Sequence, residues 1–257
     1  MTRNGGMHGG LMWLASLGVL ALLVGLWQLA AMYELVSPVF FPAPMRSFES
    51  LADQLASAEF WQAFRATVSR MVMGFVSASI AGVLLGALIG LSPSARAYIE
   101  PSLELVRPLP ASAMIPVFVL LLGLNDRMIV AAIAFSSLWP VLLNTVHGFK
   151  TVEPRLLEVA RILQLSRLET VWKIALPSAL PDIFAGLRLA LTVSLILAVV
   201  AEMLAGTVGL GQNITLAARS FRSADLYAGI IVLGALGYLT NMLLARAEQH
   251  LLRWRTS

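Results

Sequence analysis

The residue types that usually perform catalysis are few in this chain, and none has a partner at a useful spacing. There is no cysteine, so thiol catalysis, disulfide bonds and thiolate metal sites are not available. The histidines His8, His147 and His250 are far apart in the sequence, and Ser136 and Ser137 have no neighbouring base. Because a nucleophile needs a base to activate it, the sequence predicts no catalytic site.

Charged side chains instead gather in residues 150–182, between two long apolar segments. Leucines, Val171 and Trp172 give this region an apolar side, with Arg and Glu on the other. Two interpretations are open on this pattern. The region could be a hairpin held by a partner protein below the membrane, or a basic amphipathic segment that lies on the membrane surface.

Local signals predict two short helices within the charged region. Pro154 favours the first turn of a helix that would end near Leu163. Ser166 and Glu169 have the spacing of a capping box at the start of the next helix. We expect that helix to end near Ala175, because the proline at position 177 disfavours helical backbone in the residue before it.

The elements around this region are long apolar segments. The chain is 58% apolar and 12% charged, with a mean hydropathy of +0.82, which excludes an ordinary soluble domain and a disordered chain. A transmembrane helix needs about 20 apolar residues, and long continuous runs exclude a transmembrane β-barrel. The sequence predicts an all-α polytopic membrane protein with a single domain over residues 1–257. About six spans are expected, at residues 11–33, 68–92, 102–124, 128–148, 183–205 and 226–246.

The first span is expected to be a retained helix, because its apolar run is too long for the core of a secretory signal. Residues 46–64 are expected to form an amphipathic surface helix. In the second span, Gly74, Ala78, Gly82, Gly86 and Gly90 recur every fourth residue, which favours close packing of another helix in lipid.

The basic residues predict the orientation of the chain. With the N-terminus inside, the inner segments hold Arg3, Arg96, Arg107, Lys150, Arg155, Arg161, Arg167, Lys173, Arg188, Arg246, Arg253 and Arg255. The outer segments hold Arg46, Arg65, Arg70, Arg127, Arg219 and Arg222. The positive-inside rule therefore places both termini and the 150–182 loop in the cytoplasm.

Two features within the spans are candidates for a solute pathway or gate. Prolines crowd the third span, and Pro116 lies within it, so this span is expected to be kinked. Glu202 is an acidic residue in the fifth span, and such residues are often functional. Arg188 lies fourteen residues before it, about 21 Å along a helix, so these two cannot pair within that helix.

The charged loop resembles the EAA loop of bacterial ABC importer permeases, which reads EAA, three residues, Gly, nine residues and I-x-L-P. Glu158, Ala160, Ile174, Leu176 and Pro177 stand at the expected positions. Similar stretches occur from about residue 38 to residue 254, at 70–75, 107–116, 140–145, 181–188, 201–203 and 209–211.

Two residues of the loop depart from the family pattern. Val159 stands where alanine is usual, and Gln164 stands where glycine is usual. Glycine allows a sharp left-handed turn that glutamine resists. The turn between the two helices is therefore where this chain departs most from the family.

The resemblance implies a permease subunit of an ATP-driven importer of the nitrate, sulfonate and taurine group, in a bacterial inner membrane. It implies a second permease copy, two cytoplasmic ATPase subunits that bind ATP and Mg, and a periplasmic or lipid-anchored binding protein. No nucleic acid and no cofactor of this chain's own are implied, and the chain has no G-x-x-x-x-G-K-[ST] loop that would hold phosphates. The implied coupling residues are Glu158, Val159, Ala160, Arg161, Gln164, Ile174, Leu176 and Pro177.

A secondary transporter or channel that works without an ATPase is the alternative. It would need carboxylates or histidines within the membrane as ion couplers. Beyond Glu202, the spans offer few such groups.

Overall fold

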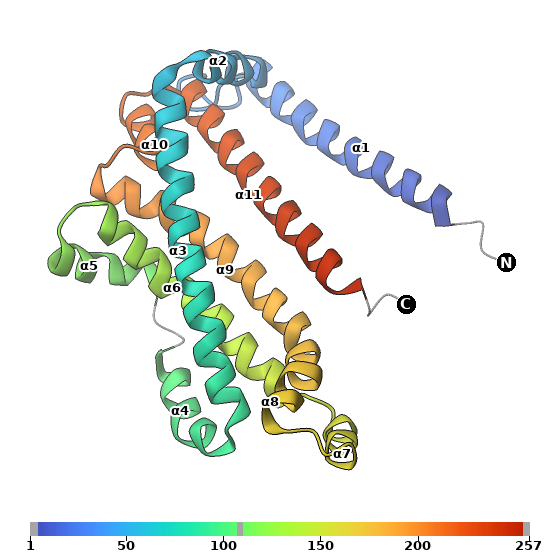
Figure 1. Ribbon diagram of the computed structural model, residues 1–257. Coiled ribbons are helices and arrows are strands. Elements are labelled where there is room, and N and C mark those ends of the chain that lie inside the picture. The colour runs from blue at the N-terminus through green and yellow to red at the C-terminus, as the bar shows by residue number, and fades with distance from the viewer. Residues whose placement is uncertain (1–4, 107–109, 254–257) are drawn as a thin grey trace. The chain divides into compact units, whose positions relative to one another are not determined.

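The computed structural model describes residues 5–106 and 110–253, and within these ranges the ordered elements are helices, with no strand (Figure 1). The predicted all-α fold class is confirmed. In chain order the elements are α1 (Gly5–Met32), α2 (Pro44–Ala56), α3 (Ala58–Leu91), α4 (Pro93–Val106), η1 (Ala111–Met114), α5 (Ile115–Leu122), α6 (Asp126–Lys150), α7 (Pro154–Ile162), α8 (Arg167–Thr170), the π-helix η2 (Val171–Ala175), α9 (Leu176–Ala205), α10 (Leu210–Arg219) and α11 (Ser223–Leu251).

The chain forms two compact units, which we call unit 1 and unit 2. Unit 1 comprises residues 1–61 and 213–232, and unit 2 comprises residues 62–212 and 233–257. Helices α3, α10 and α11 each contribute residues to both units. The residues of the charged loop and Glu202 all belong to unit 2.

Aromatic side chains hold unit 1 together. The Trp27 ring packs against Phe41 and Tyr227, and its Nε1 donates a hydrogen bond of 2.9 Å to the backbone oxygen of Pro42. The surface helix expected over residues 46–64 is shorter than predicted. Helix α2 ends at Ala56, because the backbone of Ser57 is extended and its hydroxyl accepts from the N–H of Phe60 in the first turn of α3.

In unit 2, the glycines of α3 let α6 approach closely. Added Cβ atoms at Gly74, Gly82, Gly86 and Gly90 would each lie less than 3 Å from side-chain atoms of α6. At Gly86, that atom would be 2.6 Å from Cβ of Thr145. The predicted role of the small-residue stripe in helix packing is confirmed.

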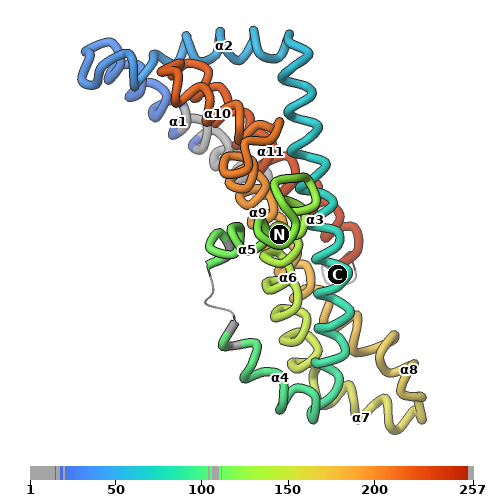
Figure 2. The backbone as a smooth tube through the Cα atoms, turned by 90° about the vertical axis from the view of Figure 1, so that its left-hand side faces the viewer, coloured from blue at the N-terminus to red at the C-terminus, as the bar shows by residue number. Residues whose placement is uncertain are grey.

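Helix α6 also packs along α9, and the two run antiparallel (Figure 2). The hydroxyls of Ser137 and Ser194 form a buried hydrogen bond of 2.8 Å between them. Gly148 lies against Ala179, further toward the end of α6 that leads into the charged loop. This contact therefore holds the start of α9 against the end of α6, so the two ends of the charged loop lie close together.

Within the described residues, four helical segments are long and apolar enough to cross a membrane: Ala58–Leu91, Asp126–Lys150, Arg167–Ala205 and Ser223–Leu251. They contain the predicted spans 68–92 (to within one residue), 128–148, 183–205 and 226–246. The first predicted span falls in the 28-residue helix α1.

The third predicted span, which we expected to be kinked, is divided between separate helices over 102–124. Its first residues belong to α4, and a separate eight-residue helix, α5, follows η1 (Figures 1 and 2). The backbone of Pro110 is extended, and Pro116 starts α5 because its missing N–H is harmless in a first turn. Arg107 lies outside the described residues. Neither α4 nor α5 reaches the length of about 20 residues that a span requires.

Candidate coupling site

Helix α7 forms the first half of the charged loop and closely matches its predicted bounds. Pro154 occupies its first turn, and Leu163 is its C-terminal cap. Ala160 is buried, whereas Glu158, Val159 and Arg161 are exposed. The helix thus turns the small residue of the motif toward its own chain and presents Glu158 and Arg161 outward.

The turn after α7 is left-handed even though it contains glutamine. Gln164 has φ of 50°. Its N–H donates to the oxygen of Arg161 over 3.1 Å, and the N–H of Leu165 donates to the oxygen of Ala160 over 3.0 Å. These two bonds are the pattern of a Schellman motif, in which glycine is usual. Gln164 therefore preserves the turn at the cost of an unfavourable backbone conformation.

The predicted capping box at the start of α8 is confirmed. The hydroxyl of Ser166 accepts from the N–H of Glu169, and the Glu169 carboxylate accepts from the N–H of Ser166. Lys173 forms an ion pair with the same carboxylate at 3.0 Å. The Ser166 backbone N–H, the Lys173 ammonium and the Ser166 hydroxyl together lower the pKa of Glu169 to about 2.

The second helix of the loop does not end near Ala175, so that prediction is wrong. Helices α8, η2 and α9 form one continuous helix from Arg167 to Ala205, 39 residues in all. The π-helical turn explains how Pro177 is accommodated: the N–H of Leu176 bonds to the oxygen of Val171, five residues back. The wider turn relieves the clash that a proline ring makes in an α-helix.

This continuous helix is longer than a membrane is thick. At 1.5 Å per residue it measures about 58 Å, whereas the hydrocarbon core of a bilayer is about 30 Å thick. Its first part, with Glu169 and Lys173, therefore extends beyond the membrane core. Residues 167–182 of the charged loop and the fifth span are therefore parts of one continuous helix.

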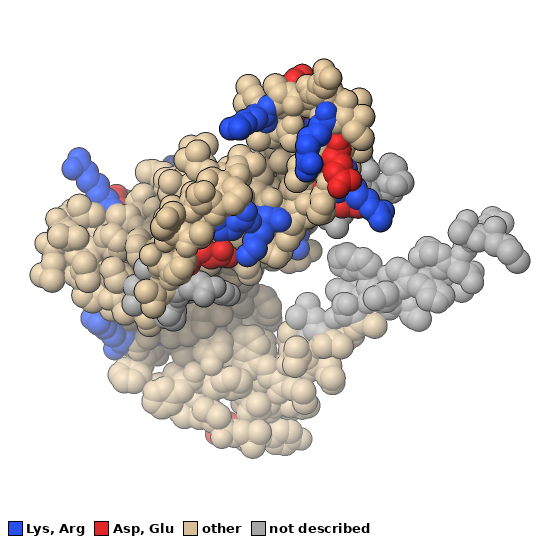
Figure 3. Space-filling model, turned by 90° about the horizontal axis from the view of Figure 1, so that it is seen from below, with Lys and Arg blue, Asp and Glu red and all other residues tan. Residues whose placement is uncertain are grey.

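Several apolar side chains of the loop point away from the chain. Ile162 is 79% exposed, Leu168 69% and Trp172 64%. The amphipathic pattern predicted an apolar side, and the structure leaves much of it uncovered within this chain. Together with the charges at this end of unit 2 (Figure 3), the loop presents a mixed apolar and ionic surface.

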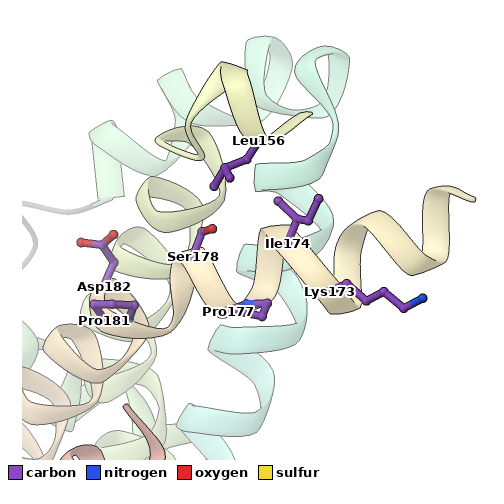
Figure 4. A pocket seen from close by; sticks show the side chains of 7 residues that line it. All are labelled: Leu156, Lys173, Ile174, Pro177, Ser178, Pro181 and Asp182. Carbon is purple, nitrogen blue, oxygen red and sulfur yellow. The ribbon is translucent and has the colours of Figure 1, made fainter. Parts of the chain in front are cut away.

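A pocket of about 380 Å³ lies between α7 and the continuous helix. Figure 4 shows Leu156 of α7 on one side of it, with Ile174, Pro177, Ser178 and Asp182 on the other. Ile174, Leu176 and Pro177 are half-buried, and Ile174 and Leu176 pack with the core residues Ala175 and Ala179. The I-x-L-P part of the motif thus anchors the loop to the helix bundle.

Glu202 lies near the opposite end of α9 and is completely buried. Its carboxylate accepts from Thr67 Oγ1 at 2.9 Å, Arg70 Nη1 at 2.8 Å and the Gly211 N–H at 3.1 Å. Arg70 is also paired with Asp126, the first residue of α6, at 2.7 Å. Arg188, by contrast, is paired with Glu248 of α11.

The two pathway candidates are not brought together as one site. Pro116 is exposed in the first turn of α5, whereas Glu202 is sealed among its partners. A role for either in the pathway stays a prediction.

The partners of Glu202 were not predicted from the sequence. Thr67 and Arg70 come from α3, and the loop of residues 206–211 supplies backbone groups. One signal was present in the sequence: Arg70 and Glu202 are opposite charges near the same predicted side of two apolar spans. Such charges are expected to pair.

Comparison with known proteins agrees with this geometry. The chain is 31% identical over 245 residues to a Bacillus subtilis (strain 168) protein named as an aliphatic sulfonates transport permease. The aligned region covers 95% of this chain and 89% of that protein. It is 32% identical to the taurine transport system permease protein of Escherichia coli (strain K12), covering 93% and 89% of the two chains. It is also 32% identical to the nitrate import permease protein of Leptolyngbya laminosa, covering 86% and 81%.

A solved structure with a similar fold is the amino acid ABC transporter with histidines, at a TM-score of 0.59 and 17% identity, covering 76% of this chain and 93% of that chain. The profile of the family described as "Binding-protein-dependent transport system inner membrane component" matches residues 78–256. The chain is a member of this family and is a permease subunit of an ABC importer of the nitrate, sulfonate and taurine group.

Proposed function

We propose that this permease imports a small solute that carries an anionic group, with an organosulfonate such as taurine as the first candidate, and that a separate ATPase drives it through the loop of α7, α8 and η2. The observation that carries the proposal is the continuity of the loop with the fifth span. A partner that moves α8 acts on α9 through an unbroken helical backbone, in which the π-helical turn η2 joins the two.

The surface of α7 suits a protein partner. Glu158 and Arg161 are exposed, and within the described residues neither forms an ion pair. Ile162 and Leu168 are exposed beside them. An apolar centre bordered by charges is typical of protein interfaces. We infer that a groove on the ATPase receives this surface, with Glu158 and Arg161 in ion pairs at its edge.

Lipid is a weaker candidate for covering the loop. A helix that lies on a membrane is usually rich in Lys and Arg on its polar face. The charges of α7, α8 and η2 instead mix signs, with Glu158 and Glu169 among the basic residues Arg155, Arg161, Arg167 and Lys173. Mixed charges favour a partner with complementary charges over an anionic lipid surface.

The proposed orientation places the loop and the C-terminus in the cytoplasm. The ion pair between Arg188 and Glu248 brings the end of α11 toward the part of α9 that adjoins the loop. Twelve of the eighteen basic residues fall in the predicted inner segments listed above, which supports this orientation. We further propose that two copies enclose the pathway, and that a binding protein delivers the solute on the outer side.

The proposed substrate class comes from the relatives. Relatives that match most of this chain are named for aliphatic sulfonates, taurine and nitrate, which are small solutes that each carry a negatively charged oxygen-rich group. Sulfonates are placed first because the relatives that cover nearly the whole chain are named for them.

The test is ATP-dependent uptake by the complex purified from its own membrane and placed in liposomes with the binding protein. We expect uptake of labelled taurine or an alkanesulfonate, with competition by the unlabelled compound. Uptake of nitrate or bicarbonate alone would reject the sulfonate assignment but keep the importer.

A Glu158→Lys variant tests the docking surface in the same assay. Because Glu158 is exposed, the variant is expected to insert and accumulate normally but to lose most ATP-driven uptake. Glu153→Lys is the matched control, since Glu153 is also exposed but lies before α7. Normal uptake by Glu158→Lys would overturn the docking role. Uptake that needs no ATP in the unsubstituted protein would favour a secondary transporter.

A further inference from the structure

The buried cluster around Glu202 connects three parts of unit 2 that are distant in sequence. We call it the Glu202 cluster: Thr67 and Arg70 of α3, Glu202 of α9, Asp126 at the start of α6, and the 206–211 loop, by which we mean residues 206–209 together with the first two residues of α10. Both α3 residues contact Glu202 directly. They also hold the loop, since Arg70 donates to the oxygen of Val208 at 2.8 Å and Thr67 accepts from the N–H of Leu210 at 2.9 Å.

Burial makes the contacts among Glu202, Arg70 and Thr67 difficult to separate. Glu202 has no exposed surface, and Arg70 is 6% exposed. A buried charge is tolerated only with its partners in place, so partial separation of these groups is strongly unfavourable. The loop also has no spare room, because a Cβ atom on Gly209 would lie 2.2 Å from the Glu202 carboxyl carbon. The outer ends of α3 and α9 and the loop must therefore move together.

The position of the cluster relates it to the coupling loop. Glu202 is near the last turn of the continuous helix that begins at Arg167. The 33 residues from Glu169 to Glu202 span about 50 Å of helix. Figure 1 shows α8 and the loop after α9 at opposite ends of this helix. A displacement of α8 reaches the cluster along this one continuous helix.

We propose that the Glu202 cluster is the joint through which the fifth span moves α3 and the 206–211 loop when the ATPase acts, so that Arg70 and Thr67 are positioning residues for coupling. This inference rests on the proposed function. The ion pair of Arg70 with Asp126 is the contact of the cluster that separates most easily, because the Asp126 side chain is 71% exposed and water can replace it at Arg70.

The competing explanation is that the cluster only stabilises the fold. The two explanations predict different effects on complex yield, transport and ATP hydrolysis when the contacts of the cluster are weakened. Loss of stabilisation lowers the yield of complex, and transport and ATP hydrolysis fall together. Loss of the joint leaves the assembled complex hydrolysing ATP while the outer loop no longer responds.

The experiment uses the complete complex in liposomes, with a spin label on a cysteine introduced at Val208. The chain has no cysteine of its own, and Val208 is 53% exposed, so the permease carries one label after it is purified, labelled and then combined with its partners. The label's mobility is compared without nucleotide and with ATP and vanadate. The variants are Glu202→Gln, which leaves Arg70 paired with Asp126, and Gly209→Ala, which disturbs the contact without changing any charge.

We expect the unsubstituted complex to show a nucleotide-dependent change in mobility that both variants lose while they still hydrolyse ATP. Solute moved per ATP should fall about tenfold, within the usual range of coupling between sites. Gly234→Ala is the control and should respond normally, since a Cβ there meets nothing within 4 Å.

A normal response in both variants would overturn the inference, and so would failure of both to assemble, because that outcome assigns the cluster to folding alone. Failure of the proposed function is recognised separately. In that case the unsubstituted complex itself would show neither a nucleotide response nor ATP-driven uptake, and the inference would fall with it.

Discussion

Replacing Gln164 by glycine is expected to stabilise the turn that follows α7 in the charged loop. Gln164 has φ of 50°, in the left-handed region. That conformation costs a residue with a Cβ atom about 1–2 kcal/mol. Glycine avoids this cost but loses about 0.5–1 kcal/mol through its greater freedom in the open state. The net gain for Gln164→Gly is therefore about 1 kcal/mol, or about fivefold in the equilibrium between closed and open turn.

The assay is hydrogen exchange at the N–H of Leu165, which donates to the oxygen of Ala160 only while the turn is formed. Local opening controls exchange at such a site, so protection in the glycine variant should rise about fivefold. Gln164→Ala is the control, because it removes the long side chain and keeps the Cβ atom. Equal gains in the two variants, or no gain with glycine, would refute the assignment of the cost to the backbone.

Two further predictions concern packing and pH. Gly86→Leu should destabilise the protein by about 1–3 kcal/mol, because a side chain there overlaps Thr145. Thermal unfolding in detergent would measure this loss of stability. The control Gly234→Leu should change the stability little, because Gly234 faces open space. The capping box should weaken in acid, because the pKa of Glu169 is lowered from 4.5 to about 2: its contribution is complete above pH 4.5 and disappears as the pH falls through about 2. Hydrogen exchange at the N–H of Ser166 would follow this loss, and protection that rises on acidification would contradict it.

Short-range features of the coupling loop were predictable from the sequence. The capping box of Ser166 and Glu169 depends on residues three apart, so its pattern and its geometry coincide. The small-residue stripe of α3 also predicted packing, because its repeat follows one face of a helix. In each case the signal and the structure involve the same few residues.

Proline gave two different outcomes for a physical reason. Pro110 and Pro116 interrupt the predicted third span, and the chain there forms separate helices. Pro177 does not end its helix, because the preceding turn widens to a π-helix. Whether a proline breaks or distorts a helix depends on what fixes the helix on both sides, which local sequence does not encode.

The partners of Glu202 were not predictable from spacing. Arg70 lies 132 residues earlier, and only the packing of α3 beside α9 brings the two charges together. The left-handed backbone of Gln164 is a similar case, because the Schellman bonds of the turn override the residue's own preference.

The most direct test of the account is purification of the tagged chain from its own membrane, with mass spectrometry of the proteins that come with it. We predict a nucleotide-binding ABC subunit in stoichiometric amount, and its loss when Glu158→Lys is combined with Arg161→Glu. The control Glu153→Lys should retain it. Recovery of the chain alone, active in liposomes without ATP, would contradict the account and identify a transporter of another class.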